Sequence, residues 1–105
     1  MSNSLGLGLL GVFGNTGLTL EQRKAIVWAK GHVIPSFDPG TWRHDDFGHV
    51  IKFSDYGDRD SKYGWEIDHI VPSALAGSDY ISNLRPLHHS RNSSLGGLLS
   101  GMLKG

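Results

Sequence analysis

Residues 65–94 constrain what this chain can be more than any other stretch. They read WEIDHIVPSALAGSDYISNLRPLHHSRNSS. A short apolar strand pattern leads into the pair Asp68-His69, a loop of small and polar residues reaches Asn83, and a polar segment carries Asn92. A carboxylate beside an imidazole, with two amides at fixed distances downstream, suits metal-assisted phosphodiester cleavage better than a structural role.

The spacing of these residues resembles the motif of a known family. DHIVP is followed by an asparagine 14 residues after the histidine and by another nine residues later, which is similar to the HNH endonuclease motif in its His-Asn-Asn form. With the preceding IKFSDYG and SKYGWEIDH, the resemblance covers about half of the chain. It implies a ββα-metal fold in which Asp68 and Asn92 are metal ligands and His69 is the general base. It also implies that backbone holds the other ring nitrogen of His69 and that Asn83 braces the loop and orients the histidine.

Local patterns predict an α+β fold from the residues themselves. Residues 49–54 and 65–71 have β-type patterns, and Pro86 and the glycines at 96–97 suit the two ends of a short helix that begins near Leu87. The predicted order of strand, strand and helix agrees with a small ββα-metal catalytic unit. On that helix, His88 and Asn92 would share one face because they are four residues apart.

Upstream of the motif, the sequence predicts a scaffold helix. The hydroxyl of Thr19 can cap its first turn, Gln22 can complete a capping box, and Gly31 ends it. The turn-rich region that follows carries Trp42 and Phe47, which we expect to be core anchors.

The domain organisation that we expect is simple. Residues 1–18 form a glycine-rich segment whose interrupted apolar run lacks a basic flank, so a tail or strap is favoured over a secretory signal. Residues 19–105 then form a single domain around the core motif of residues 65–94.

Composition narrows the classes of protein that fit. The 105 residues contain no cysteine, which excludes a four-cysteine zinc knuckle and favours a reducing compartment, so we expect a cytoplasmic protein. No apolar run approaches the roughly 20 residues that a membrane span needs. The formal net charge is zero, yet the sequence from Tyr80 onward contains no Asp or Glu and keeps the cations Arg85, Arg91 and Lys104. That mildly basic end is suited to phosphates.

The donor atoms of the motif indicate which metal would bind. Asp68 offers a carboxylate oxygen and Asn92 an amide oxygen, a set suited to Mg²⁺ or Mn²⁺. The absence of thiolates makes Zn²⁺ a weaker candidate. His69 is then free to deprotonate the attacking water, since the ordinary imidazole titrates near neutrality.

Several neighbouring polar residues have two interpretations. His88 is either an extra metal ligand or a surface residue that contacts phosphate, and we favour the second. Glu66 is either an acid that supports the site or an exposed strand carboxylate. His44 and His49 flank a turn and receive no catalytic role. Three further residues are either solvated side chains or contacts to DNA phosphates: Arg85, His89 and Arg91.

The chain also departs from the motif of the family it resembles. Leu95 stands where relatives often carry a cation, and Ala76-Gly77 stands where many have two glycines. Neither change removes a metal ligand or the base, so we expect them to affect substrate affinity and turnover rather than the type of reaction.

The leading hypothesis is therefore a DNA endonuclease that uses a divalent metal and nicks one strand per active site, as a monomer or a dimer. One alternative is a nucleic-acid-binding module that keeps the fold with a weakened site, in a phage or mobile-element assembly. Another is a metal-stabilised interaction domain of a larger assembly, such as phage packaging or recombination machinery.

Overall fold

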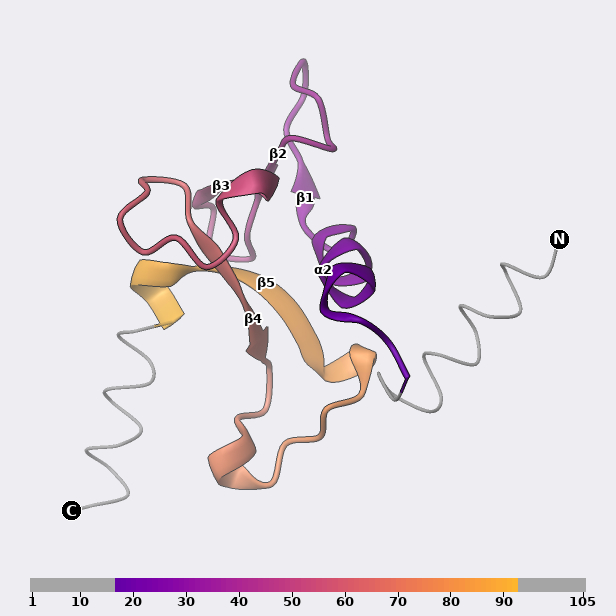
Figure 1. The fold of residues 1–105 in the computed structure, drawn as a ribbon. Coiled ribbons are helices and arrows are strands. Elements are labelled where there is room, and N and C mark those ends of the chain that lie inside the picture. The colour runs from indigo at the N-terminus through magenta and orange to yellow at the C-terminus, as the bar shows by residue number, and fades with distance from the viewer. Residues whose placement is uncertain (1–16, 93–105) are drawn as a thin grey trace, which may run out of the picture. The chain divides into compact units, whose positions relative to one another are not determined.

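Helix α2 and five short strands make up most of the regular structure in the computed structural model, which describes residues 17–92 (Figure 1). The chain is a small α+β protein, as predicted. Its contacts divide it into two compact units. Among the described residues, the first unit combines 17–30 with Ile67–Arg85, and the second combines Gly31–Glu66 with 86–92.

Helix α2 spans Leu20–Trp28 and begins as predicted. The hydroxyl of Thr19 accepts a hydrogen bond from the backbone N–H of Gln22 at 3.1 Å, and the Gln22 side chain accepts one from the Thr19 N–H at 2.9 Å. This capping box is the predicted one, and it satisfies two of the backbone donors that a helix start leaves unpaired. The helix ends before the predicted stop at Gly31, with Ala29 as its C-cap.

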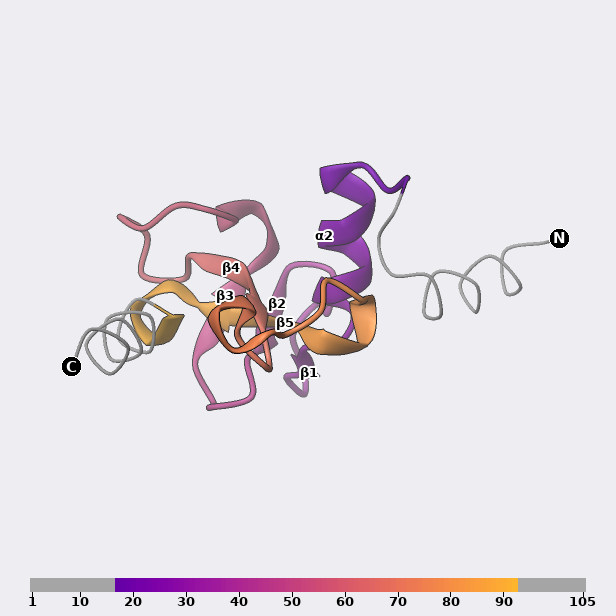
Figure 2. The same ribbon diagram turned by 90° about the horizontal axis from the view of Figure 1, so that it is seen from below.

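Within the first unit, α2 lies beside the 3₁₀ turn Ile81–Asn83, as both ribbon views show (Figures 1 and 2). The ammonium group of Lys30 donates to the carbonyl oxygen of Ile81 and, at 2.7 Å, to that of Leu84. Buried side chains of this unit include Val27, Trp28, Ile81 and Leu84. A charged group thus ties the end of the helix to the segment that leads into strand β5.

The second unit contains a three-stranded antiparallel sheet of β1 (His32–Val33), β2 (Trp42–His44) and β3 (Val50–Lys52), in that order. Trp42 faces Lys52 and His44 faces Val50 in the register. The strand predicted over residues 49–54 is shorter than expected, because Phe53–Asp55 form a 3₁₀ turn. It pairs with β2 and not with the strand that follows it in the motif.

Strands β4 (Trp65–His69) and β5 (Leu84–His88) form the other sheet. Residues 89–92 are helical, so a strand, strand, helix order does occur, but its second strand is β5. The predicted helix is therefore present, but it begins at residue 89 and not near Leu87, which belongs to β5. Strand β5 buries Leu84, Pro86 and Leu87. A proline fits this strand where its position requires no backbone N–H for pairing.

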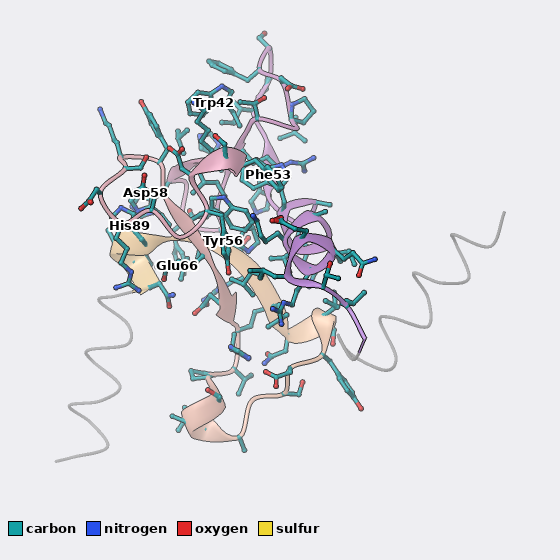
Figure 3. The ribbon with its side chains drawn as sticks, in the orientation of Figure 1. Trp42, Phe53, Tyr56, Asp58, Glu66 and His89 are labelled. Carbon is teal, nitrogen blue, oxygen red and sulfur yellow. The ribbon has the colours of Figure 1, made fainter. Side chains whose placement is uncertain are left out.

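The core of the second unit is built around Trp65, which has no exposed surface. Its ring packs against those of Tyr56 at 4.9 Å and Phe53 at 6.0 Å between centroids, and its Nε1 donates to the Phe53 carbonyl at 3.1 Å. Figure 3 labels Tyr56 and Phe53. Phe47 is not a core anchor: it is 43% exposed, and the guanidinium of Arg91 lies 4.1 Å from its ring centroid.

Several predictions concern parts of the chain outside residues 17–92. These are nearly all of the glycine-rich segment 1–18, Leu95, and the helix exit at residues 96–97. No helix within the described residues is long and apolar enough to cross a membrane.

Candidate functional site

The pair Asp68-His69 closes strand β4 in the first unit. Backbone pairing between the two segments extends one residue beyond the end of β4, since the N–H of Ile70 donates to the carbonyl of Asn83 at 2.8 Å. The side chain of Asp68 is 14% exposed and that of His69 is 30% exposed. The strand therefore brings the two residues to a partly open edge, where a loop begins.

His69 is held by a residue that the motif did not predict. Its Nε2 lies 2.6 Å from Oδ1 of Asp79, an exposed carboxylate in the loop. Among residues 17–92 the imidazole has no other hydrogen bond, so the expected backbone contact to the ring is absent there. Nδ1 is consequently the ring nitrogen that stays accessible to water. No spacing rule pointed to Asp79, because it lies in a loop of small and polar residues.

Asn83 fastens both ends of the loop between β4 and β5. Its Oδ1 accepts from the N–H of Val71 at 2.9 Å, and its Nδ2 donates to the carbonyls of Val71 at 3.0 Å and Ser78 at 2.7 Å. Three bonds from one amide fix where the loop leaves the strand and where it returns. Asn83 therefore holds the loop that carries Asp79, and it does not touch His69 directly.

The departure from two glycines changes the tip of this loop. Ala76 adopts φ 65° and ψ 27°, in the left-handed region that favours glycine. At Gly77 a Cβ atom would lie 1.6 Å from the carbonyl oxygen of Val71, so only glycine fits. The loop thus keeps the glycine that close packing requires and tolerates strain at the other position.

Asp68, the predicted metal ligand, bonds Arg85 of β5. The guanidinium Nε donates to Oδ2 of Asp68 at 3.0 Å, and both side chains are largely buried. Arg85 therefore does not extend toward solvent as a phosphate contact would. The other carboxylate oxygen of Asp68, Oδ1, has no hydrogen-bond donor among the described residues.

In the second unit, Asn92 belongs to a polar network around Glu66. The Nδ2 of Asn92 donates to Oε1 of Glu66 at 2.8 Å, and Arg59 donates to both oxygens of the same carboxylate, at 2.6 and 2.8 Å. Glu66, labelled in Figure 3, is thus neither an exposed carboxylate nor unpaired. No donor among residues 17–92 bonds the amide oxygen of Asn92.

These contacts shift the protonation of the network. The hydrogen bonds from Arg59 lower the pKa of Glu66, against an opposing effect of burial, and the Asn92 bond and the nearby charges of Arg59 and His89 lower it further. The same pairing raises the pKa of Arg59.

The network should make folding stability depend on pH. Because the pKa of Glu66 is lower when folded, its stabilisation is full above the ordinary value of 4.5 and is lost as the pH falls through the folded value. We expect the free energy of unfolding of the wild type to exceed that of Glu66→Gln by an amount that shrinks with acidification. Urea titrations from about pH 7 to about pH 3 measure this difference, and a difference that is constant with pH would contradict it.

The side chains of His88 and His89, which were predicted to contact metal or phosphate, instead bond other groups of the second unit. His88 belongs to β5 and is buried, with only 9% exposed, so both the surface position and the shared helix face with Asn92 were wrong. Its Nε2 lies 2.8 Å from the Lys62 carbonyl and its Nδ1 lies 2.8 Å from the Ser90 hydroxyl. His89 stacks on it at 4.5 Å and places its own Nε2 2.8 Å from the Ser61 carbonyl.

Sequence reasoning missed Asp45, a fully buried carboxylate of the second unit. Its Oδ1 accepts from the N–H groups of Phe47 and His49, each at 2.9 Å, and its Oδ2 accepts from the N–H of His88 at 3.0 Å. Asp45 thereby joins the turn after β2 to the end of β5. The Asp-Asp-Phe-Gly turn signal was visible in the sequence, but the partner 43 residues away was not.

Comparisons with known protein families, with curated proteins and with solved structures find no match to this chain. Within residues 17–92, no three or more His, Cys, Asp or Glu side chains gather as a metal-binding group. The motif and the geometry around His69 are therefore the features of this chain that indicate a function.

Proposed function

We propose that this chain is an HNH-type endonuclease that hydrolyses DNA phosphodiester bonds with a divalent metal and nicks one strand per active site. The observation that carries the proposal is the pair of His69 and Asp79, 2.6 Å apart beside Asp68 at the end of β4. The order of β4, β5 and the helical residues 89–92 supports it, because the family it resembles uses that order.

His69 is the general base in this proposal. If Nε2 carries the ring proton and donates a hydrogen bond to Asp79, Nδ1 has the lone pair that takes a proton from water. Asp79 then keeps the ring from turning and offsets the positive charge that the ring gains. Asn83 contributes indirectly, since it fixes the loop from which Asp79 extends.

The donor atoms of the motif fit a hard divalent cation. Asp68 retains an oxygen without a donor among the described residues, and Mg²⁺ or Mn²⁺ is typically held by one or two carboxylates with water and phosphate completing the shell. By the resemblance, the amide oxygen of Asn92 would be the second protein ligand. When bound, the metal supplies charge stabilisation for the phosphate and the departing 3′ oxygen. Arg85 shares the Asp68 carboxylate and so competes with a cation for its charge.

Loss of the Asp79 carboxylate should slow catalysis without preventing it. We expect Asp79→Ala to lower kcat by roughly 10–100-fold with little change in KM, the scale seen when a partner that orients a site histidine is removed. The kcat of Asp79→Asn, which keeps an oxygen acceptor, should decrease less than that of Asp79→Ala. Asp46→Ala is a matched control, because Asp46 makes a similar 2.7 Å contact with His32 in the second unit. Equal losses in the variant and the control would contradict the role.

The proposed function is tested by cleavage of supercoiled plasmid in Mg²⁺, Mn²⁺, Zn²⁺ and EDTA, together with calorimetric titration of Mn²⁺. We expect cleavage in Mg²⁺ or Mn²⁺, none in EDTA, and loss of both cleavage and Mn²⁺ binding in Asp68→Ala. Unchanged Mn²⁺ binding in Asp68→Ala would mean that the metal lies elsewhere.

One observation favours a second candidate, a nucleic-acid-binding module with a weakened site. Both motif ligands already bond protein groups, Asp68 with Arg85 and Asn92 with Glu66. In that case the plasmid is not cleaved in any metal, Arg85→Ala does not restore cleavage, and the protein still binds DNA in a gel-shift assay.

A further inference from the structure

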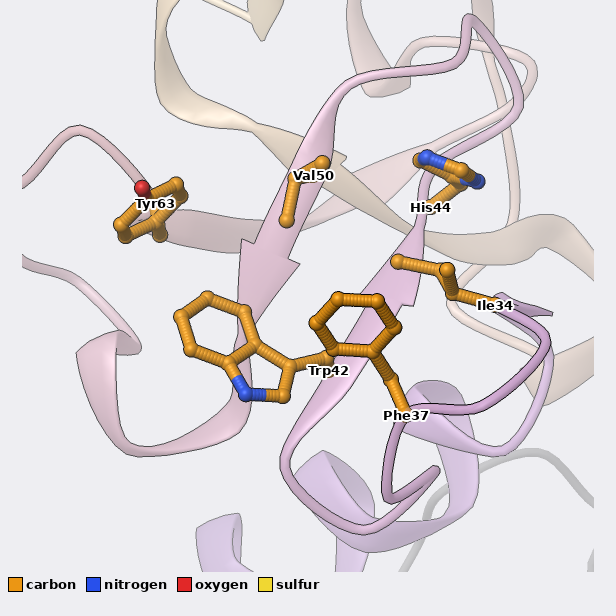
Figure 4. A pocket seen from close by; sticks show the side chains of 6 residues that line it. All are labelled: Ile34, Phe37, Trp42, His44, Val50 and Tyr63. Atoms are coloured by element: carbon orange, nitrogen blue, oxygen red, sulfur yellow. The ribbon is translucent and has the colours of Figure 1, made fainter.

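The sheet of the second unit carries a pocket that the proposed nuclease chemistry does not use. Its volume is about 390 Å³, within the range of roughly 300–1,000 Å³ that is typical of small-molecule sites. Aromatic and aliphatic side chains form most of its wall, with one imidazole (Figure 4). The lining residues are Ile34, Phe37, Trp42, His44, Val50 and Tyr63.

Two aromatic rings of the wall are held in place while a third stays open. Trp42 and Tyr63 meet edge to face, with centroids 5.0 Å apart and planes at 90°. Phe37, in contrast, is 55% exposed. The turn that presents it includes Ser36 at φ 73°, a left-handed conformation that is strained for a residue other than glycine. The chain thus accepts backbone strain beside an exposed ring at the pocket, an arrangement suited to a flat ligand.

The charge around the pocket is complementary to phosphate. The Lys52 ammonium lies 5.4 Å from the Trp42 ring centroid, and neither Lys52 nor Lys62, the neighbour of Tyr63, has a carboxylate partner within residues 17–92. The nearby Asp38 turns its oxygens to its own loop, where the Thr41 hydroxyl and the Gly40 N–H bond them. No acidic side chain lines the pocket.

We propose that this pocket binds one unpaired nucleobase of a nucleic-acid strand, stacked on Phe37 and Trp42, with an adjoining phosphate near Lys52. The proposal rests on the proposed function, which makes a nucleic acid the substrate. Aromatic platforms beside cations are the usual means of holding single strands, because every base offers a π face and the backbone offers negative charge. An apolar protein side chain would use the same walls but would leave the lysines without a counter-charge.

Tryptophan fluorescence gives a direct readout of this pocket. The chain has three tryptophans, and Trp28 and Trp65 are buried, so an added ligand can reach only Trp42. We expect a single-stranded oligothymidylate to quench the emission saturably in EDTA, where cleavage does not proceed. A blunt duplex of mixed sequence should quench far less. Absence of quenching by the single strand would overturn the proposal.

Variants of the exposed ring connect the binding to the pocket. Phe37→Ala should weaken the affinity for the oligonucleotide roughly 5- to 150-fold, the equivalent of about 1–3 kcal/mol per stacked base. Phe37→Tyr should retain it because the ring remains. Val33→Ala, an exposed apolar position of β1 outside the pocket lining, is the matched control. Equal affinity in Phe37→Ala and wild type, or quenching that instead follows self-association of the protein, would overturn the proposal.

The outcome does not depend on catalysis. Binding in EDTA can succeed while plasmid cleavage fails in every metal, which would reject the nuclease and keep the base pocket. Cleavage without quenching would reject the base pocket and keep the nuclease.

Discussion

His69→Ala is expected to lower plasmid cleavage by about 10²–10⁴-fold at saturating metal, the scale typical of losing a general base. His69 ends strand β4, its Nε2 is held by Asp79, and its other nitrogen is left for water. Affinity for Mn²⁺ should be unchanged, because the proposed ligands are oxygens of Asp68 and Asn92.

Single-turnover cleavage rates and Mn²⁺ calorimetry on the same preparations measure both expectations. His32→Ala is the matched control, since His32 also places its Nε2 against an aspartate, 2.7 Å from Asp46, but lies in the first strand of the other unit. Its cleavage rate should equal that of wild type. A His69→Ala protein that cleaves within a few-fold of wild type would exclude the role as base.

The second large effect concerns folding. Asp45→Ala should lower the free energy of unfolding by about 1–3 kcal/mol, the cost of leaving one buried N–H group unpaired, because it removes the acceptor of three backbone N–H groups whose bonds are buried in one case and partly buried in two. Those groups belong to Phe47, His49 and His88. Loss of their anchor should loosen both the turn after β2 and the end of β5.

Urea unfolding followed by tryptophan fluorescence measures this loss. Asp46→Ala is the neighbouring control, since its side chain is 42% exposed and its ion pair with the exposed His32 lies at the surface, and the stability of this variant should change by less than about 1 kcal/mol. Asp45→Asn should fall between the two, because one oxygen acceptor remains. A loss in Asp45→Ala no larger than that of the control would show that water replaces the carboxylate.

Local signals in the sequence were sufficient for the elements that depend on neighbours in the chain. The capping box of Thr19 and Gln22 needs only residues three apart, and its prediction is confirmed. The strand before His69 also follows from a local pattern. No strand was predicted over Leu84–His88, because Pro86 was interpreted as the entry to a helix, although proline suits a helix start and an edge strand equally.

Contacts between distant residues could not be read from the sequence. His88 is buried because the Lys62 carbonyl and the Asp45 carboxylate receive its ring and backbone donors, and both lie far away in the chain. Asp79 meets His69 only because Asn83 closes the loop between them. Motif spacing identifies which residue types could do the chemistry, whereas these partners depend on how the loop folds.

The most direct test of the proposed nuclease is to add Mn²⁺ to EDTA-treated protein on supercoiled plasmid and then to treat the products with DNA ligase. Hydrolysis that releases the 3′ oxygen leaves a 3′ hydroxyl and a 5′ phosphate. We therefore expect nicked circles that form only after Mn²⁺ is added and that ligase reseals. Nicks that form in EDTA, nicks that ligase cannot seal, or plasmid that stays supercoiled with Mn²⁺ present would contradict the proposed function.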